Sequence, residues 1–160
     1  MPPPLIINPD ELNWDRPLYT REQIYAVLPQ QHEFSQLDAI ICLDKESVTA
    51  AAYRDVREDE WWCRGHMPGS PIFPGVLMVE SAAQLAAFMQ NIIIPFDRGF
   101  MGFGGIDQVK FRSSVVPPCR ILIVGHGVDY RPRRFIYDTQ AFVNGTMVFE
   151  GRITGMKITL

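Results

Sequence analysis

Residues 74–94 read PGVLMVESAAQLAAFMQNIII, and this stretch decides how the rest of the chain folds. It is rich in alanine and leucine, has no glycine or proline after its first two positions, and would be apolar on nearly every face of a helix. Such a helix is either buried on all sides or spans a membrane. Its polar residues, Glu80 and Gln84 among them, would be costly in lipid, and no Lys or Arg flanks it closely. The sequence therefore predicts a long helix enclosed by the protein itself, and no membrane association.

Strand-like runs lie on both sides of this helix. Two precede it and four follow it, near residues 37–43, 47–57, 106–112, 119–129, 133–143 and 146–158. Asn144-Gly145 joins the last two runs, and Asn-Gly is the dipeptide most typical of a type I′ hairpin turn. Strands joined by such short turns pair antiparallel. The pattern predicts an α+β protein in which a curved antiparallel sheet of about six strands wraps around one long helix.

The beginning of the chain is different in composition. Residues 1–19 are rich in proline, and we expect them to form an arm ahead of a single domain at residues 20–160. Thr20 and Gln23 have the spacing of a capping box, which predicts a short helix at residues 21–28. Glycines at positions 99, 102, 104 and 105 predict a turn or bulge beside the strand at 106–112.

Charge and composition exclude several classes of protein. The chain has 160 residues, of which 47% are hydrophobic and 21% charged, as expected for one folded domain. Residues 1–65 carry 6 basic and 12 acidic side chains, whereas residues 66–160 carry 9 and 6. This balance argues against a nucleic-acid-binding protein but allows a local positive surface for an acidic partner.

Cofactor sites and compartment are also constrained. The three histidines lack the spacing of metal ligands, and the glycines form no phosphate-binding fingerprint, so neither a metal nor a nucleotide is expected. Cys42, Cys63 and Cys119 are odd in number and far apart, which argues against a disulfide framework. Because the first residues also carry no basic region typical of a secretory signal, we expect a cytoplasmic protein.

Glu80 is the only charged side chain in the thirty residues 67–96. A carboxylate on an enclosed helix without a neighbouring Lys or Arg lacks a counter-charge, so burial favours its neutral form and raises its pKa. A carboxylic acid that stays protonated near neutral pH can act as a general acid. Gln84 lies one turn further on the same helix face and can orient it. The alternatives are that Glu80 meets an arginine from elsewhere in the fold or reaches solvent.

His66 precedes the helix in a loop, GHMPGSPIFPG at residues 65–75, whose three prolines and three glycines indicate a shaped backbone. Histidine suits the role of a general base near neutral pH, although a lone loop histidine also fits a structural or solvated role. The first N–H groups of the helix, at Gly75 and Val76, lack partners within the helix and carry the positive end of its dipole. They can stabilise a carbonyl oxygen that acquires negative charge.

Residues 65–84, GHMPGSPIFPGVLMVESAAQ, resemble the signature of the FabZ-type 3-hydroxyacyl-[acyl-carrier-protein] dehydratases, roughly GHFPxxPxxPGVLxxEAxAQ. Residues 105–112, GIDQVKFR, and the VVPP at 115–118 are similar to the family's GID…F…VxPGD strand. The likeness extends over about residues 21–157. The spacing of fourteen residues between His66 and Glu80, with PGVL between them, is far more specific than a short glycine motif.

This resemblance implies a hot-dog fold and homodimers, commonly grouped as a trimer of dimers, with each active site at a dimer interface. It implies that His66 of one subunit faces Glu80 of the other. The implied reaction removes water from 3-hydroxyacyl thioesters of acyl carrier protein, giving trans-2-enoyl thioesters in fatty acid biosynthesis, with His66 as base and Glu80 as acid and with no cofactor. Related dehydratase/isomerases usually have Asp at this position, so Glu80 favours dehydration alone. The expected oxyanion and substrate-binding residues are Gly75, Val76, Gln84 and Phe103.

The chain departs from the family pattern at several positions, of which Met67, in place of the usual phenylalanine, is a conservative apolar change. Two other departures bear on packing and on the acyl tunnel. Residues 28–38 read LPQQHEFSQLD where the family usually has a sequence like LPHRxPxLLxD, so polar Ser35 and Gln36 replace apolar residues. We expect packing or subunit contacts to differ there. Gly102 precedes Phe103 where many members have a tyrosine that gates the acyl tunnel, which argues against a tyrosine gate here.

Acyl carrier proteins are acidic, so the resemblance also implies a positive docking surface. The densest basic cluster is Arg131, Arg133 and Arg134, with Arg112 and Arg120 on neighbouring strands. The same cluster is compatible with an ordinary solvated hairpin.

Two other functions stay open at this point. A thioesterase, or a dehydratase that serves polyketides or other specialised lipids, would keep the same core. A non-catalytic subunit would bind acyl chains without turnover.

Overall fold

The computed structural model describes residues 1 and 3–159, and its centre is the long helix α2, Gly75–Ile93. Twelve residues of this helix are buried. By length and composition α2 could cross a bilayer, yet most of it is buried inside the protein, which is typical of a core helix. The helix is therefore enclosed, as its composition predicts.

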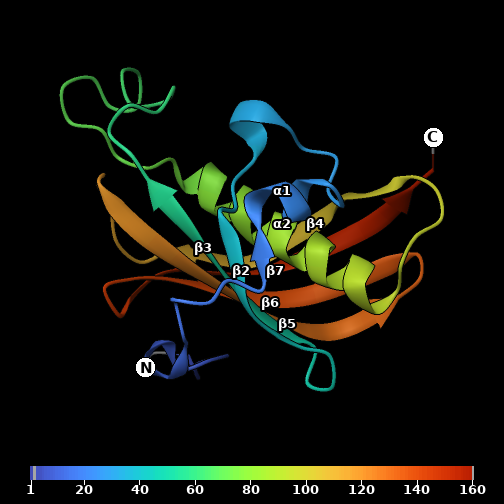
Figure 1. Ribbon diagram of the computed structural model, residues 1–160. Helices are drawn as coiled ribbons and strands as arrows, with labels where there is room; N and C mark the ends of the chain where they lie inside the picture. The colour runs from blue at the N-terminus through green and yellow to red at the C-terminus, as the bar shows by residue number, and fades with distance from the viewer. Residues whose placement is uncertain (2, 160) are drawn as a thin grey trace.

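One antiparallel sheet of seven strands curves around α2 (Figure 1). The strands follow each other across the sheet in the order β1-β2-β3-β5-β6-β7-β4, so that β1 and β4 form its edges. The extra strand relative to the prediction is β1, which has only two residues. The bounds are β1 Tyr19–Thr20, β2 Ala39–Asp44, β3 Thr49–Val56, β4 Phe100–Phe111, β5 Cys119–Arg131, β6 Arg134–Val143 and β7 Thr146–Ile158.

The hairpin between β6 and β7 confirms the turn predicted at Asn144-Gly145, since both residues have positive φ, 49° and 77°. The prediction for β4 was too short, because this strand begins at Phe100 and contains most of the glycine cluster. The register with β7 shifts between Phe103 and Gly105, which is a bulge within the strand rather than a turn beside it. A Cβ at Gly104 would lie 2.5 Å from the Met156 side chain, so β7 packs too closely there for a side chain.

The short helix α1, Arg21–Tyr25, confirms the predicted capping box. The Thr20 side chain accepts a hydrogen bond from the Gln23 N–H, and the Gln23 side chain accepts one from the Thr20 N–H. The helix ends at Tyr25, and residues 26–28 continue only as a turn. The 3-10 turn η2, His32–Phe34, follows before β2.

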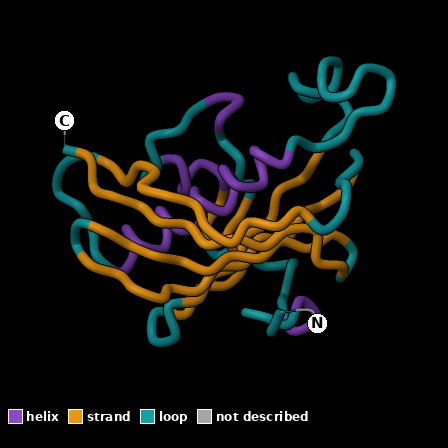
Figure 2. The backbone as a smooth tube through the Cα atoms, turned by 180° about the vertical axis from the view of Figure 1, so that it is seen from behind, coloured by secondary structure: helices purple, strands orange, loops and turns teal. Residues whose placement is uncertain are grey.

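The sheet buries apolar side chains on both of its faces. Its inner face packs on α2, and its outer face carries a smaller cluster that includes Leu122, Val124 and Phe142. The arm, with the 3-10 turn η1 at Pro9–Glu11, lies against this outer face, opposite α2 (Figure 2). The arm residues that pack there are Ile6, Ile7, Leu12 and Trp14. Glu80, on α2, therefore lies on the inner side of the sheet.

Candidate active site

Glu80 and Gln84 lie one turn apart on α2 and their side chains are hydrogen-bonded, with Gln84 Nε2 donating to Glu80 Oε1 at 2.8 Å. Because the amide N–H can only donate, Oε1 is an acceptor and Oε2 is the oxygen available to carry a proton. Burial raises the pKa of the Glu80 carboxyl above its ordinary value, and the Gln84 hydrogen bond opposes this only in part. Among residues 1 and 3–159 no Lys or Arg forms an ion pair with Glu80.

Every hydrogen-bonding position of the Gln84 amide is occupied. Nε2 donates to the Phe34 carbonyl oxygen at 2.7 Å as well as to Glu80. Oε1 accepts from the Tyr25 hydroxyl at 2.6 Å and from the Gln36 N–H at 3.1 Å. Two donors at the oxygen and two acceptors at the nitrogen determine the orientation of this amide. Gln84 therefore presents an N–H to Glu80 from a fixed position.

Glu80 opens onto a hollow of about 100 Å³ between α2 and the sheet. No other titratable side chain lines this hollow among the described residues. A second hollow of about 300 Å³ adjoins it and extends to Asn91 near the end of the helix. Apart from Glu80, the lining of the first hollow is mainly apolar, as suits a hydrocarbon chain. The residues of the first hollow are Gln30, Glu80, Ala83, Gln84, Ala87, Phe100, Met101, Gly102, Phe103, Phe135, Ile153, Thr154 and Gly155.

His66 lies in the loop at residues 57–73, which projects from the end of β3 before the chain returns to α2 (Figure 1). Its Nδ1 is 2.8 Å from the Ile72 carbonyl oxygen. A carbonyl oxygen only accepts, so Nδ1 carries the ring proton and Nε2 keeps a free lone pair, which is the tautomer that a general base needs. His66 does not line the hollow of Glu80. A single chain therefore does not bring the predicted base and acid into one cavity.

The start of α2, where the oxyanion site is expected, lies outside the Glu80 hollow of the same chain. Pro74 supplies no side-chain cap to the first N–H groups, and Val76 is 74% exposed. A Cβ at Gly75 would lie 2.8 Å from the ring of Phe111, which thus covers this position from the end of β4. Gly75 and Val76 lie outside the Glu80 hollow, whereas Gln84 and Phe103 line it together with Glu80.

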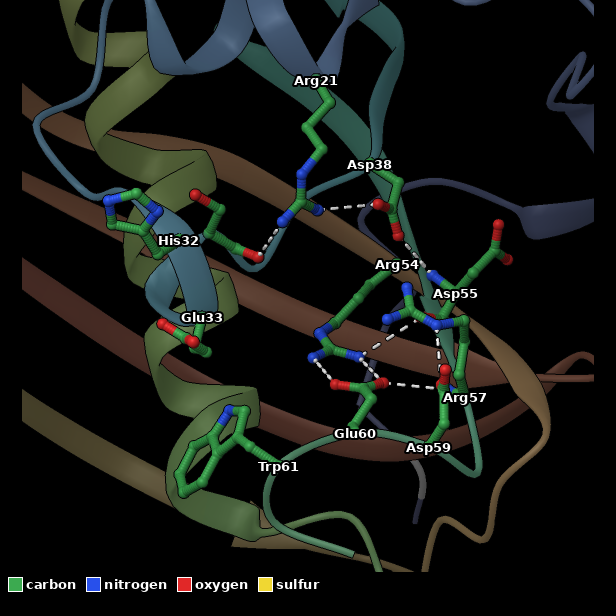
Figure 3. A pocket seen from close by; sticks show the side chains of 11 residues that line it. Arg21, His32, Glu33, Asp38, Arg54, Asp55, Arg57, Asp59, Glu60 and Trp61 are labelled. Carbon is green, nitrogen blue, oxygen red and sulfur yellow. Dashed lines mark hydrogen bonds and ion pairs between the residues drawn. The ribbon is translucent and has the colours of Figure 1, made fainter.

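A buried ion pair that sequence reasoning missed holds the root of the His66 loop (Figure 3). Arg54 on β3 donates to both carboxylate oxygens of Glu60, at 2.9 and 2.6 Å, and the two side chains are 6% and 7% exposed. The Arg54 guanidinium also stacks over the ring of Phe73 at 4.7 Å. Since Glu60 and Phe73 lie near opposite ends of the loop, Arg54 anchors both. The only sequence signal was an arginine in a mainly apolar strand-like run, AAAYR at residues 50–54.

The predicted carrier-docking arginines lie at the turn between β5 and β6. Arg131 and Arg134 both pair with Asp129, at 3.0 and 2.8 Å, so part of their charge is neutralised. Gln90 Nε2 donates to the Arg131 carbonyl oxygen at 3.0 Å. Because Gln90 is ten residues beyond Glu80, these arginines lie about 15 Å further along the helix than the acid. Arg112 and Arg120 do not join this cluster. Arg120 lies at the opposite end of β5 from Arg131 and pairs with Asp55, and Arg112 follows the far end of β4 and pairs with Glu150.

Comparison with known proteins adds independent evidence. A family model described as the FabA-like domain matches residues 28–152. The 3-hydroxyacyl-[acyl-carrier-protein] dehydratase FabZ of Sorangium cellulosum (strain So ce56) is 32% identical over 133 residues, which cover 82% of this chain and 85% of the relative. FabZ of Brucella abortus (strain S19) is 35% identical over 136 residues, which cover 84% of this chain and 86% of the relative.

Two solved structures are similar in fold. The dehydratase heterocomplex ApeI:P from Xenorhabdus doucetiae superposes with a TM-score of 0.72 at 13% identity, covering 85% of this chain and 91% of that one. A mutant of the thioesterase PA1618 from Pseudomonas aeruginosa gives a TM-score of 0.67 at 14% identity, covering 91% and 98%. Identities this low bear on the fold alone, and they confirm the predicted hot-dog architecture.

Proposed function

The chain belongs to the FabA-like family, and from this premise we propose that it dehydrates 3-hydroxyacyl thioesters of acyl carrier protein to trans-2-enoyl thioesters in fatty acid biosynthesis. The observation that carries the proposal is Glu80, a partly buried carboxyl without a cationic partner that lies beside an apolar hollow. FabZ relatives at 32% and 35% identity support it.

The chemistry follows from the protonation states of the two side chains. His66 Nε2 removes a proton from the carbon next to the thioester carbonyl. The N–H groups at the start of α2, near Gly75, stabilise the enolate oxygen that forms. Glu80 Oε2 donates its proton to the departing 3-hydroxyl group, the C–O bond breaks, and water leaves. The imidazolium and the carboxylate then exchange a proton through solvent. Because no electrons or chemical groups are stored, the reaction needs no cofactor.

We place each active site between two copies of the chain. His66 lies away from the hollow of its own Glu80, so a complete site needs a histidine from elsewhere. β4 is a sheet edge of 12 residues, and the side chains of Phe103, Ile106 and Phe111 on it are exposed. Natural proteins cover such long apolar edges. A second copy of the chain paired along β4 would cover this edge. Three such dimers would form the expected hexamer. The molar mass in solution tests this assembly.

Two substitutions test the assigned roles. We expect His66→Ala and Glu80→Gln each to lower turnover by roughly 10²–10⁴-fold, because each removes one proton-transfer group. Turnover is followed by the absorbance of the conjugated enoyl thioester, with 3-hydroxybutyryl and longer carrier-linked substrates. Both variants should keep the circular dichroism and molar mass of the wild type. Near-normal turnover of either variant contradicts the roles, and release of free 3-hydroxy acid would indicate a thioesterase.

Mixing the two inactive variants tests the shared site. A dimer of one His66→Ala chain and one Glu80→Gln chain contains one intact site and one site that lacks both groups. Random exchange of subunits should therefore restore roughly a quarter of the wild-type activity. Unmixed variants at the same total concentration are the control. If mixing restores nothing although mass spectrometry shows mixed dimers, the two residues act within one chain.

Three finer expectations are part of the proposal. Since Glu80 is not an aspartate, the trans-2-enoyl thioester should be the only product, without a 3-enoyl isomer. The three cysteines are free, which suits a reducing cytoplasm.

Arg131, Arg133 and Arg134 are the proposed carrier-docking residues. Arg133→Glu with Arg134→Glu should therefore abolish carrier binding, and wild-type binding should weaken as salt is added. Unchanged binding in that double variant would place the carrier elsewhere.

A further inference from the structure

Gln36 is fully buried although it is polar, and it stands where the dehydratase pattern usually has an apolar residue. A buried amide is costly unless its polar groups are hydrogen-bonded. Here all three groups have partners: Nε2 donates to the Glu33 carbonyl oxygen at 2.9 Å, Oε1 accepts from Arg54 Nε at 2.9 Å, and the main-chain N–H donates to Gln84 Oε1 at 3.1 Å. Gln36 therefore contacts the partner of Glu80 and the anchor of the His66 loop at the same time.

Tyr25 holds the same amide from the other side. Its hydroxyl oxygen accepts from the Leu37 N–H at 2.7 Å and lies 2.6 Å from Gln84 Oε1. Because the Leu37 N–H can only donate, the hydroxyl proton points at Gln84. Burial raises the pKa of the Tyr25 hydroxyl above its ordinary value, so it is protonated at neutral pH. Neither Tyr25 nor Gln36 lines the hollow in which the substrate would lie.

We propose that Tyr25 and Gln36 are positioning residues of the dehydratase. Tyr25 orients the Glu80 carboxyl through Gln84, and Gln36 joins Gln84 to the Arg54–Glu60 pair at the root of the His66 loop. Figure 3 shows that ion pair. The inference rests on the proposed function, since it assigns both residues to the same reaction.

The effect of Tyr25 on Glu80 has a defined sign. A hydroxyl that donates to the Gln84 carbonyl polarises the amide and makes its N–H a stronger donor. A stronger donor stabilises the ionised form of Glu80 more than the neutral form. Removal of the Tyr25 hydroxyl should therefore raise the pKa of Glu80. A Tyr25 hydroxyl that is a stronger hydrogen-bond donor should lower the pKa of Glu80.

Few charged groups lie near Glu80 and Tyr25, so the effect should be measurable. From β3, Arg54 contacts the assembly at Gln36 and is paired with Glu60. From α1, Arg21 lies over the Tyr25 ring at 5.7 Å and pairs with Asp38. From η2, His32 and Glu33 are exposed to solvent. The parts of β4, β6 and β7 that line the Glu80 hollow contribute no charged side chain.

The first test substitutes Tyr25→Phe and measures the ionisation of Glu80 directly, by ¹³C NMR of labelled glutamate carboxyls, with Glu80→Gln to assign the signal. We expect an upward shift of the Glu80 titration, a shift of the alkaline limb of kcat in the same direction, and a fall in kcat on the order of tenfold from lost orientation. Tyr137→Phe is the matched control, because Tyr137 is a buried tyrosine whose hydroxyl has no partner. Tyr137→Phe should leave the Glu80 titration, the alkaline limb of kcat and kcat itself unchanged.

Tyr25→Phe also leaves the buried Leu37 N–H without an acceptor, and a second replacement covers the case in which this variant fails to fold. Incorporation of 3-fluorotyrosine at position 25 keeps the shape and the acceptor but makes the hydroxyl a stronger donor. The Glu80 titration should then move downward. Two replacements with opposite effects exclude a purely structural role. An unchanged Glu80 titration in either folded protein overturns the proposal for Tyr25.

The second test addresses Gln36. Gln36→Leu keeps the main-chain N–H that donates to Gln84 but removes the oxygen that accepts from Arg54. It should therefore lower kcat several-fold and speed amide hydrogen exchange in residues 57–73. The Glu80 titration should stay unchanged. Gln36→Glu retains a side-chain oxygen that accepts from Arg54. It should therefore restore most of kcat and most of the protection of residues 57–73 from hydrogen exchange. Gln140→Leu, a buried glutamine that binds the arm, is the control. Unchanged exchange and kcat in Gln36→Leu would overturn its role.

The two kinds of failure are distinguishable. If the wild type does not dehydrate any 3-hydroxyacyl thioester, the proposed function fails, whereas the NMR titration and hydrogen exchange still report on the positioning contacts. If the wild type dehydrates these substrates but the variants match it, only the positioning roles are wrong.

Discussion

Glu60 and Glu80 are identical side chains in similar degrees of enclosure, yet their surroundings set them to opposite states. Glu60 receives two hydrogen bonds from the Arg54 guanidinium, one from the Arg57 N–H and one from the Trp62 indole N–H. Burial acts to raise the pKa of Glu60, but these donors outweigh it and hold the pKa below its usual range. Glu80 receives a single neutral amide N–H, so burial dominates and its pKa is raised. The charge of the neighbour, rather than burial alone, decides which carboxyl can serve as an acid.

The opposite pKa shifts also match different roles, a structural one for Glu60 and the proposed catalytic one for Glu80. A carboxylate paired with a guanidinium is fixed in its charged form and suits an anchor, which is how Glu60 holds the loop that carries His66. A carboxyl kept neutral is costly to ionise and suits proton donation. The sequence left open that an arginine from elsewhere in the fold meets Glu80. Among residues 1 and 3–159 no arginine pairs with Glu80, and the buried Arg54 binds Glu60 instead.

We expect the largest effect for Arg54→Met, which leaves the Glu60 carboxylate buried and unpaired. We expect the free energy of unfolding at pH 7, measured by urea denaturation, to fall by about 3–5 kcal/mol. A double variant with Glu60→Met as well should recover most of the loss, because no charge is then buried. A loss under about 1 kcal/mol would instead be typical of an exposed pair.

A smaller effect is expected for Glu60→Gln, and it should depend on pH. Because the folded-state pKa of Glu60 is lowered, its ionisation contributes stability above the unfolded-state pKa of about 4.3, and this contribution is lost as the pH falls through the lower folded value. At pH 7 the variant should be about 1–3 kcal/mol less stable than the wild type. The gap should narrow in acid, and unfolding midpoints between pH 3 and 7 would check this. A gap independent of pH would contradict the lowered pKa.

The smallest expected effect is that of Glu80→Gln on stability, and its sign is opposite. Because the folded-state pKa of Glu80 is raised, the wild type loses stability as the pH rises through that value, whereas the variant does not. The variant should therefore be slightly more stable at pH 8 and should match the wild type below pH ~4.3. Thermal unfolding of the variant and the wild type at the same protein concentration, at pH 8 and in acid, measures these two stability differences. A variant that is less stable than the wild type at pH 8 would show that Glu80 is ionised and well stabilised.

Local signals predicted much of the fold. The enclosed helix, the capping box at Thr20 and the hairpin turn at Asn144-Gly145 each depend on residues a few positions apart, so spacing was sufficient. The early start of β4 was missed, because glycines usually indicate turns and here they allow a close approach to β7. The unusual Gln36 was noticed, but its partners were not predictable.

The sequence by itself determined that Glu80 would have no charged neighbour along its helix, and that Gln84 would lie beside it. Those facts depend on one helical turn. Only the tertiary structure decided what orients Gln84, since Tyr25 and Gln36 are 59 and 48 residues away from it in the chain. Hydrogen-bond partners across such distances depend on strand register and loop path, which residue spacing does not specify. For the same reason only the fold showed that Arg54 would bind Glu60 and leave Glu80 without a counter-charge.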